Sequence, residues 1–291
     1  MKRSFTLALL CLIAPFFAHS QGTIKESLII NSSILNKEVR YNIYLPSDYN
    51  SSERSYPVLY LLHGYTDDET GWTQFGQVGK IADQQADNVE IAPMIIAMPD
   101  GGVTFYVNSY DEKELWEDFF IQEFIPFIDK TYHTRAEKQF RAVAGLSMGG
   151  HGALIFGLKH PELFAASAPL SAGVLTEKEF IDMAQNSWDN VWGIPYGKGL
   201  VGKKRISDHM KNNWAISLVE NGNTEEQKKV KYYIDCGDDD FLVRGNLALK
   251  LAMMDKGIEH EFRMRQGGHS WSYWRTALPD VLLFVSESFR R

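Results

Sequence analysis

A single serine is flanked by glycines in the segment G-L-S-M-G at residues 145–149. A buried-strand pattern at residues 140–145 precedes it, and an apolar helical pattern follows it as far as Pro161. A sharp strand-to-helix turn strains the serine backbone, and side chains two residues to either side would collide with neighbouring elements unless both residues are glycines. The following helix directs free N–H groups and its positive dipole end towards the serine. The pattern therefore predicts that Ser147 is an exposed nucleophile.

A serine nucleophile needs a histidine as base and an acid that orients the histidine. At turns of this kind, the acid and then the histidine follow the serine along the chain. Only His260 and His269 lie far enough downstream to follow a further strand. His260 alternates with charged and apolar neighbours in a predicted strand, which indicates a structural or surface role. His269 follows two glycines beyond that strand, so a loop can place its imidazole over Ser147, and we predict His269 as the base.

The acid is expected just after the strand that precedes the one with His260. The segment IDCGDDDFL there offers Asp235, Asp238, Asp239 and Asp240. Spacing alone does not choose among these residues, because consecutive aspartates are also typical of a solvated turn or a helix N-cap. His63 and the acidic run at residues 67–69 could suggest a metal site, but we expect them to shape the loop that contains Tyr65.

Strands and helices must alternate to position these residues. Helical patterns occur at residues 112–130, where Pro126 is expected to kink the helix, and at 247–257, where Gly257 ends it. Alternating strands and helices predict an α/β fold with a mostly parallel sheet covered by helices on both faces. Active residues collect beyond the carboxyl ends of such strands, and residues 175–225 are candidates for a cap over them. The predicted strands are residues 39–45, 57–62, 93–98, 140–145, 163–170, 231–236 and 260–265.

The bulk composition is that of a globular protein. The chain has 291 residues, of which 44% are hydrophobic and 23% charged, and it carries a formal net charge of -7. Because no basic excess is available to neutralise phosphates, nucleic acid is not a predicted partner. We find no internal repeat or low-complexity linker, so a single domain over residues 21–291 is expected.

The first twenty residues resemble a secretory signal peptide. Lys2 and Arg3 precede an apolar run at residues 5–17, and a small-x-small cleavage pattern ends at Ser20. The run contains Pro15 and is shorter than the roughly 20 residues of a spanning helix. We therefore predict a signal peptide at residues 1–20, export to the periplasm or the extracellular space, and no stable membrane insertion after its removal. Cys236 then remains as a lone cysteine that cannot form an intramolecular disulfide.

Five segments together resemble a known family. They are YLLHGYTDDETGW at residues 60–72, MPDGG at 98–102 with YVNS at 106–109, GLSMGGHGAL at 145–154, CGDDDFL at 236–242 and QGGHSWSYW at 266–274. In this order they resemble the esterase D-like branch of the α/β-hydrolases. That branch includes the feruloyl and acetylxylan esterases of carbohydrate esterase family 1, the S-formylglutathione hydrolases and the mycolyltransferases of the antigen 85 type. The resemblance implies an α/β-hydrolase fold.

The resemblance also implies the roles of particular residues. It implies a triad of Ser147, Asp240 and His269, in which Asp240 is the third residue after the glycine of the CGDDD segment. An oxyanion hole would be formed by the backbone N–H groups of Tyr65 and Met148, and no metal or other cofactor would be required. Trp271 and Trp274 adjoin His269 and are the best candidates to line the substrate cleft.

The implied activity is that of a secreted serine carboxylic ester hydrolase with an acyl-enzyme intermediate. Export argues against the cytosolic glutathione pathway and favours acetyl or feruloyl groups on acylated polysaccharide, or another small ester, as the substrate. An acyltransferase of the antigen 85 type and a thioesterase like S-formylglutathione hydrolase are the alternatives. The sequence predicts no oligomeric state.

Overall fold

A central eight-stranded sheet organises the protein. The computed structural model describes residues 21–289, so the predicted signal peptide lies outside the described residues. The strand order is β1-β2-β4-β3-β5-β6-β7-β8. The pairs β1–β2 and β2–β4 are antiparallel, and all later pairs are parallel. The strands are β1 (Thr23–Ser32), β2 (Lys37–Leu45), β3 (Val58–Leu62), β4 (Ile95–Pro99), β5 (Arg141–Leu146), β6 (Ala166–Leu170), β7 (Lys231–Gly237) and β8 (His260–Arg265).

The prediction of an α/β fold with a mostly parallel sheet is confirmed, and all seven predicted strands are present within a few residues of their expected bounds. The structure adds β1, which was not predicted. This edge strand alternates poorly between buried and exposed positions, its register shifts between Lys25 and Leu28, and Ser27 has a φ of 50°. An irregular, mostly exposed strand leaves no clear period-2 signal in the sequence.

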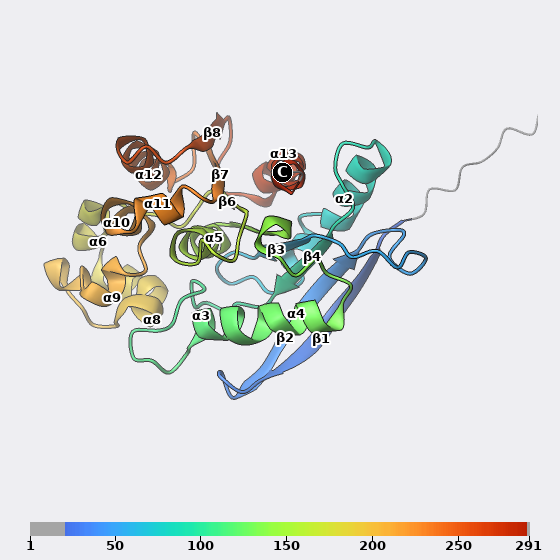
Figure 1. The fold of residues 1–291 in the computed structure, drawn as a ribbon. Coiled ribbons are helices and arrows are strands. Elements are labelled where there is room, and N and C mark those ends of the chain that lie inside the picture. The colour runs from blue at the N-terminus through green and yellow to red at the C-terminus, as the bar shows by residue number, and fades with distance from the viewer. Residues whose placement is uncertain (1–20, 290–291) are drawn as a thin grey trace, which may run out of the picture.

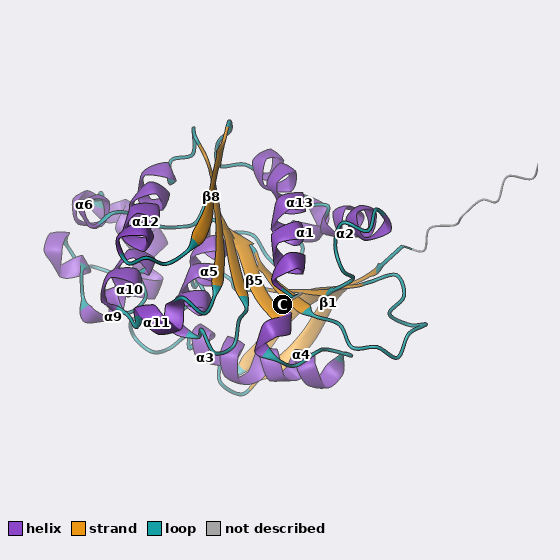
Figure 2. Cartoon of the chain, turned by 45° about the horizontal axis from the view of Figure 1, so that its top comes forward, coloured by secondary structure: helices purple, strands orange, loops and turns teal. Residues whose placement is uncertain are grey.

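Helices cover both faces of the sheet (Figures 1 and 2). Two separate apolar cores result, one on each face. The helix α5 after Ser147 is buried from Met148 to Leu158, so it is apolar all round and lacks an amphipathic pattern. One face carries α1 (Gly71–Gln74), α2 (Val78–Asp87) and α13 (Trp271–Ser288); the other carries α3 (Trp116–Phe119), α4 (Ile125–Thr131), α5 (Met148–Lys159) and α12 (Val243–Asp255).

The predicted helix at residues 112–130 is interrupted by a wide turn. A π-helical segment, η1 (Phe120–Phe124), joins α3 to α4, and Pro126 lies in the first turn of α4. Because proline has no N–H to donate to the preceding turn, the departure from α geometry lies just before Pro126. The ring of Phe120 from this segment stacks on Phe156 of α5, with centroids 4.4 Å apart.

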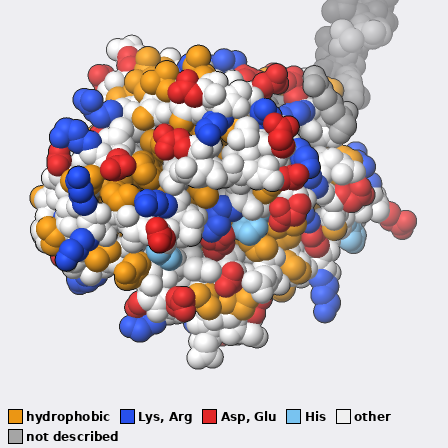
Figure 3. Space-filling view, turned by 60° about the vertical axis from the view of Figure 1, so that its left-hand side comes forward, with side chains coloured by type: hydrophobic (Ala, Val, Ile, Leu, Met, Phe, Trp, Pro, Cys, Tyr) orange, Lys and Arg blue, Asp and Glu red, His pale blue; other side chains and the backbone are white. Residues whose placement is uncertain are grey.

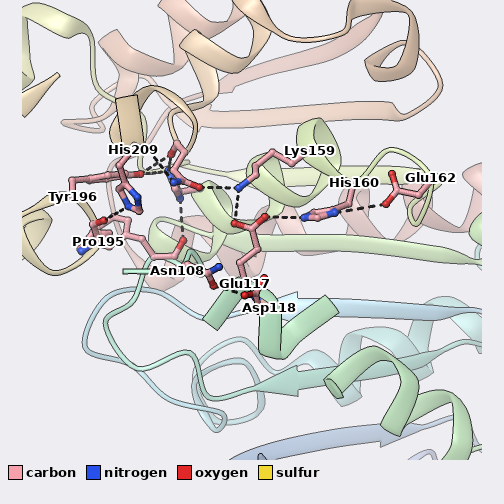
Figure 4. A network of polar contacts seen from close by, with 12 residues as sticks. Asn108, Glu117, Asp118, Lys159, His160, Glu162, Pro195, Tyr196 and His209 are labelled. Carbon is pink, nitrogen blue, oxygen red and sulfur yellow. Dashed lines mark hydrogen bonds and ion pairs between the residues drawn. The ribbon is translucent and has the colours of Figure 1, made fainter. Parts of the chain in front are cut away.

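Residues 175–225 form short helices beyond the carboxyl ends of the strands, and we call this segment the cap. Its elements are α6 (Glu177–Asp182), α7 (Gln185–Ser187), η3 (Trp188–Trp192), α8 (Gly193–Tyr196), η4 (Gly202–Arg205), α9 (Asp208–Lys211) and α10 (Ala215–Asn221), and α11 (Thr224–Gln227) begins at its end. A polar network ties the cap to the sheet-covering helices (Figure 4). Lys159 of α5 donates to Glu117 of α3 at 2.6 Å and to Asn213 of the cap at 2.9 Å.

No helix within residues 21–289 is both long enough and apolar enough to cross a membrane.

Candidate active site

Ser147 lies at the turn between β5 and α5 with a φ of 54° and a ψ of −114°, a strained conformation for a residue with a side chain. Both flanking residues must be glycines, because a side chain at either position would collide with the backbone. A Cβ on Gly145 would lie 2.5 Å from the carbonyl oxygen of Gly149, and one on Gly149 would lie 2.4 Å from that of Leu62. The turn is held by the Ser147 N–H, which donates to the Leu170 carbonyl of β6 at 2.9 Å.

His269 reaches the serine from the loop between β8 and α13. Its Nε2 lies 2.9 Å from Ser147 Oγ, and its Nδ1 lies 2.9 Å from Asp240 Oδ2. The imidazole is packed between the Phe241 ring, with centroids 4.6 Å apart, and the edge of Trp274, with centroids 4.8 Å apart. The structure therefore brings together three side chains that are 29 to 122 positions apart in the sequence.

Asp240 is the aspartate that faces His269. Its side chain is fully buried. Burial raises the pKa of this carboxyl, but hydrogen bonds from His269 and from the Leu242 N–H outweigh burial, so the pKa lies below its ordinary value. An ionised carboxylate at this position can hold the Nδ1–H tautomer of the imidazole.

The other three aspartates of the segment have different partners. Asp238 accepts a hydrogen bond from the Gly267 N–H at 2.9 Å, and Asp239 uses its backbone N–H to bond the Gly267 carbonyl. Asp235 is buried beneath α13, where it accepts from the hydroxyls of Tyr273 and Tyr233 and pairs with Arg265. Asp238 and Asp239 thus fasten the loop that leads to His269, and Asp235 is a core residue.

Ser171 is a residue beside the site that was not predicted from the sequence. It follows β6, is fully buried and has a φ of 43°. Its hydroxyl accepts a hydrogen bond from Trp274 Nε1 at 3.0 Å, and it also helps to lower the pKa of Asp240 by hydrogen bonding. The only signal in the sequence was its position at the carboxyl end of a predicted strand.

Two backbone N–H groups lie next to Ser147. Met148 is the first residue of α5, so its N–H has no acceptor within the helix. Gly64 is close on the other side, because a Cβ there would lie 3.7 Å from the Ser147 Cβ, and Tyr65 follows it. The Tyr65 hydroxyl donates to the Asn190 carbonyl of the cap at 2.7 Å.

His63 fixes the loop that contains Tyr65. Its Nε2 accepts from the Gly101 N–H at 2.8 Å, so Nδ1 carries the proton and donates to the Gly64 carbonyl at 2.8 Å. The ring is buried and both nitrogens are occupied. Within residues 21–289, no group of three or more His, Cys, Asp or Glu side chains is arranged to hold a metal ion.

A cleft of about 850 Å³ opens over Ser147 and His269. Trp271 and Trp274, the best candidates from the sequence, both line it. Trp192 from the cap also lines it. The ring of Trp192 lies against Phe105, with centroids 4.3 Å apart. Phe105 has a φ of 55°, so a strained loop presents this ring. The remaining walls are mostly apolar and include Leu175, Met183, Val191, Phe241 and Leu242.

A parallel sheet flanked by helices, with a serine at the turn after β5 and a histidine after β8, defines an α/β-hydrolase. The sequence model of the family described as "Putative esterase" matches residues 32–285, and the chain belongs to this esterase family. The predicted resemblance to the esterase D-like branch is confirmed.

Individual relatives agree with the family. Esterase Rv1288 of Mycobacterium tuberculosis is 32% identical over 78% of this chain, and the match covers 52% of that protein, so the chain spans about half the length of this relative. An endo-1,4-β-xylanase/feruloyl esterase of Xylanibacter ruminicola is 37% identical over 48% of this chain and 20% of its own length. A solved structure of a ferulic acid esterase superposes with a TM-score of 0.81 and 31% identity, covering 92% of this chain and 99% of the other.

Proposed function

We propose that this protein is an exported serine esterase that hydrolyses carboxylic esters through an acyl-enzyme. One observation carries the proposal: Ser147 Oγ, the imidazole of His269 and the carboxylate of Asp240 form an unbroken chain with 2.9 Å at each contact. This is the arrangement in which a base can activate a serine hydroxyl while an acid holds the base in place.

In the proposed reaction, Ser147 Oγ attacks the ester carbonyl carbon and its proton moves to His269 Nε2. The carbonyl oxygen becomes an oxyanion, and the N–H groups of Tyr65 and Met148 donate to it. When the tetrahedral intermediate collapses, the bond to the alcohol oxygen breaks and His269 returns the proton to the leaving alcohol. A water molecule then repeats the sequence on the acyl-enzyme and releases the acid, while Asp240 stabilises the imidazolium in both halves.

The cleft supports an aromatic acyl group as the preferred substrate. Its walls bring Trp192, Phe105 and Trp271 close to Ser147, and its volume of about 850 Å³ is far larger than an acetyl group fills. Flat apolar walls favour a ring such as that of a feruloyl group by burial and by ring stacking. Two of the similar proteins are named as feruloyl or ferulic acid esterases. With export through residues 1–20, we propose feruloylated polysaccharide as the substrate and an acetyl ester as a poorer one.

The test compares kcat/KM for methyl ferulate and for an acetyl ester of matched leaving group. We expect the ferulate to be favoured and Ser147→Ala to abolish both turnover and labelling by a fluorophosphonate. Labelling that persists in Ser147→Ala would refute Ser147 as the nucleophile. Preference for the acetyl ester would refute the aromatic acyl assignment while leaving the serine mechanism intact. Transfer of the acyl group to added sugar in place of water would indicate an acyltransferase.

A further inference from the structure

β8 forms one edge of the sheet, and β7 is its single strand neighbour in the described part of the chain. The pairing runs without interruption from His260 to Arg265. The Arg265 carbonyl accepts from the Asp238 N–H on the β7 side. Because backbone groups alternate in direction along a strand, those of His260, Phe262 and Met264 point out towards the free edge.

The two faces of β8 differ in character. On the side of α13 lie Glu261, Arg263 and Arg265, and Arg265 pairs there with Asp280. On the side of α12 lie Phe262, which Lys250 of that helix covers, and Met264, which is 54% exposed. The strand thus presents an ionic row on one face and an apolar row on the other.

α12 extends the apolar row. Leu247, Leu251 and Met254 are all exposed and follow one another at steps of four and three residues, so they form a single stripe along the outer side of the helix. Figure 3 looks onto the side of the molecule that carries α12, and apolar side chains gather along its upper rim. An exposed apolar stripe beside an unpaired strand is typical of an association surface.

We propose that a second copy of this chain binds here by antiparallel pairing of β8 with β8 about a two-fold axis at Phe262. The outward backbone groups of Phe262 then pair with those of Phe262 in the second copy, and His260 pairs with Met264. On the ionic face, Glu261 of each copy then lies directly opposite Arg263 of the other copy, so the symmetry produces two such pairs. The result is one continuous sheet across two molecules, with the α12 stripes flanking the axis.

Charge complementarity fixes this register. Moving the axis by one residue would place either Arg263 opposite Arg263 or Glu261 opposite Glu261, and like charges directly opposite each other destabilise a sheet. With the axis at Phe262, Glu259 also lies opposite Arg265. Of these registers, only the one with its axis at Phe262 pairs opposite charges without placing like charges opposite each other.

The other edge of the sheet is irregular. β1 has a register shift between Lys25 and Leu28, and Ser27 there has a φ of 50°. Such an irregularity bends an edge strand and prevents further pairing. The regular edge of β8 therefore distinguishes it as the pairing edge.

The experiment measures the molar mass of the purified protein by sedimentation over a wide range of concentration. We expect twice the chain mass for the wild type and the chain mass for Glu261→Arg and for Arg263→Glu, since each puts like charges opposite each other. The double variant Glu261→Arg/Arg263→Glu exchanges the charges and should restore the dimer. Lys25→Glu on β1 is the matched control and should remain dimeric.

These side chains are about half exposed, so the variants should fold, which thermal unfolding and ester turnover will verify. A wild type that stays monomeric throughout, single variants that stay dimeric, or a double variant that stays monomeric would each overturn the proposal. Because the experiment measures molar mass, a failure of the dimer proposal is distinct from a failure of the esterase assignment.

Discussion

Asp240 presents its two carboxylate oxygens to different donors, Oδ2 to His269 and Oδ1 to the Leu242 N–H. In Asp240→Asn, the amide oxygen keeps the bond to Leu242 and the NH₂ group faces the imidazole. His269 then carries its proton on Nε2 and cannot accept one from Ser147. We expect kcat to fall by about 10²-fold or more, because the wrong tautomer is stabilised and the imidazolium loses its counter-charge.

Asp238→Asn and Asp239→Asn are the matched controls for Asp240→Asn. Asp238 receives the Gly267 N–H on an oxygen that asparagine also provides, and Asp239 bonds through its backbone. Both variants should retain kcat within a few-fold on the same activated ester. A crippled Asp238 or Asp239 variant beside a normal Asp240→Asn would reassign the acid.

Tyr65→Phe tests whether Tyr65 acts through its backbone. The proposed oxyanion donor is the N–H, which the substitution leaves in place. The lost hydroxyl bonds the Asn190 carbonyl of the cap. We expect kcat within about tenfold of wild type, since loss of an oxyanion donor costs about 10²- to 10³-fold. A collapse of kcat in a folded Tyr65→Phe variant would instead give the phenol a chemical role.

Some residues of the site could be predicted from the sequence, and others could not. Ser147 and His269 could be found because each stands among glycines just beyond a strand. The order along the chain could not separate Asp240 from its neighbours, because the direction of each side chain in a turn depends on contacts with residues far away, such as Gly267. For the same reason Ser171 was missed and Trp192 could not be told apart from the other tryptophans: their roles come from packing against α13 and Phe105, which no local pattern encodes.

Among the elements, the buried strands of the sheet were predictable because a strand covered on both faces is continuously apolar. The cap was recognisable only as a segment between strands. The helices of the cap are short, and the buried side chain of Arg205 holds them together. Its guanidinium donates to the carbonyl oxygens of Phe180, Met183 and Leu200 and covers the ring of Trp188. A surface-like run of basic residues at 203–205 gives no sign of that role.

Arg205→Lys should therefore weaken the cap. A single ammonium group cannot reach carbonyls that a planar guanidinium bonds together, so buried acceptors lose their donors. We expect the free energy of unfolding in urea to fall by about 3 kcal/mol and KM for aromatic esters to rise, since the cap supplies Trp192 to the cleft. Arg244→Lys is the control, because Arg244 is largely exposed and should change neither quantity. Equal stability of the two variants would contradict this role for Arg205.

At the scale of the whole molecule, one buried side chain, His151 of α5, joins the cap to the loop that carries Phe105 in the wall of the cleft. Its Nδ1 lies 3.1 Å from the Phe105 carbonyl, and its Nε2 lies 2.7 Å from the Tyr196 hydroxyl and 3.0 Å from the Asn213 carbonyl. Burial lowers the pKa of His151 to about 4, although the two carbonyls oppose this shift. The folded protein thus holds a neutral imidazole at the junction.

This junction makes stability depend on pH. The pKa of His151 is about 4 in the folded protein and ordinarily 6.5, so the unfolded chain binds the extra proton first as the pH falls. The contribution of the neutral His151 imidazole to the free energy of unfolding is therefore complete above about pH 6.5. It is lost as the pH falls towards 4, and about 2 kcal/mol of it is lost at about pH 5. The carboxyls of Asp240 and Glu117, whose pKa values are lowered, lose their contributions only below their ordinary values near pH 4. The free energy of unfolding should fall between pH 6.5 and 5 in the wild type, and more gently in His151→Gln, which cannot bind the proton. Equal slopes in the two proteins would show that His151 does not set this dependence.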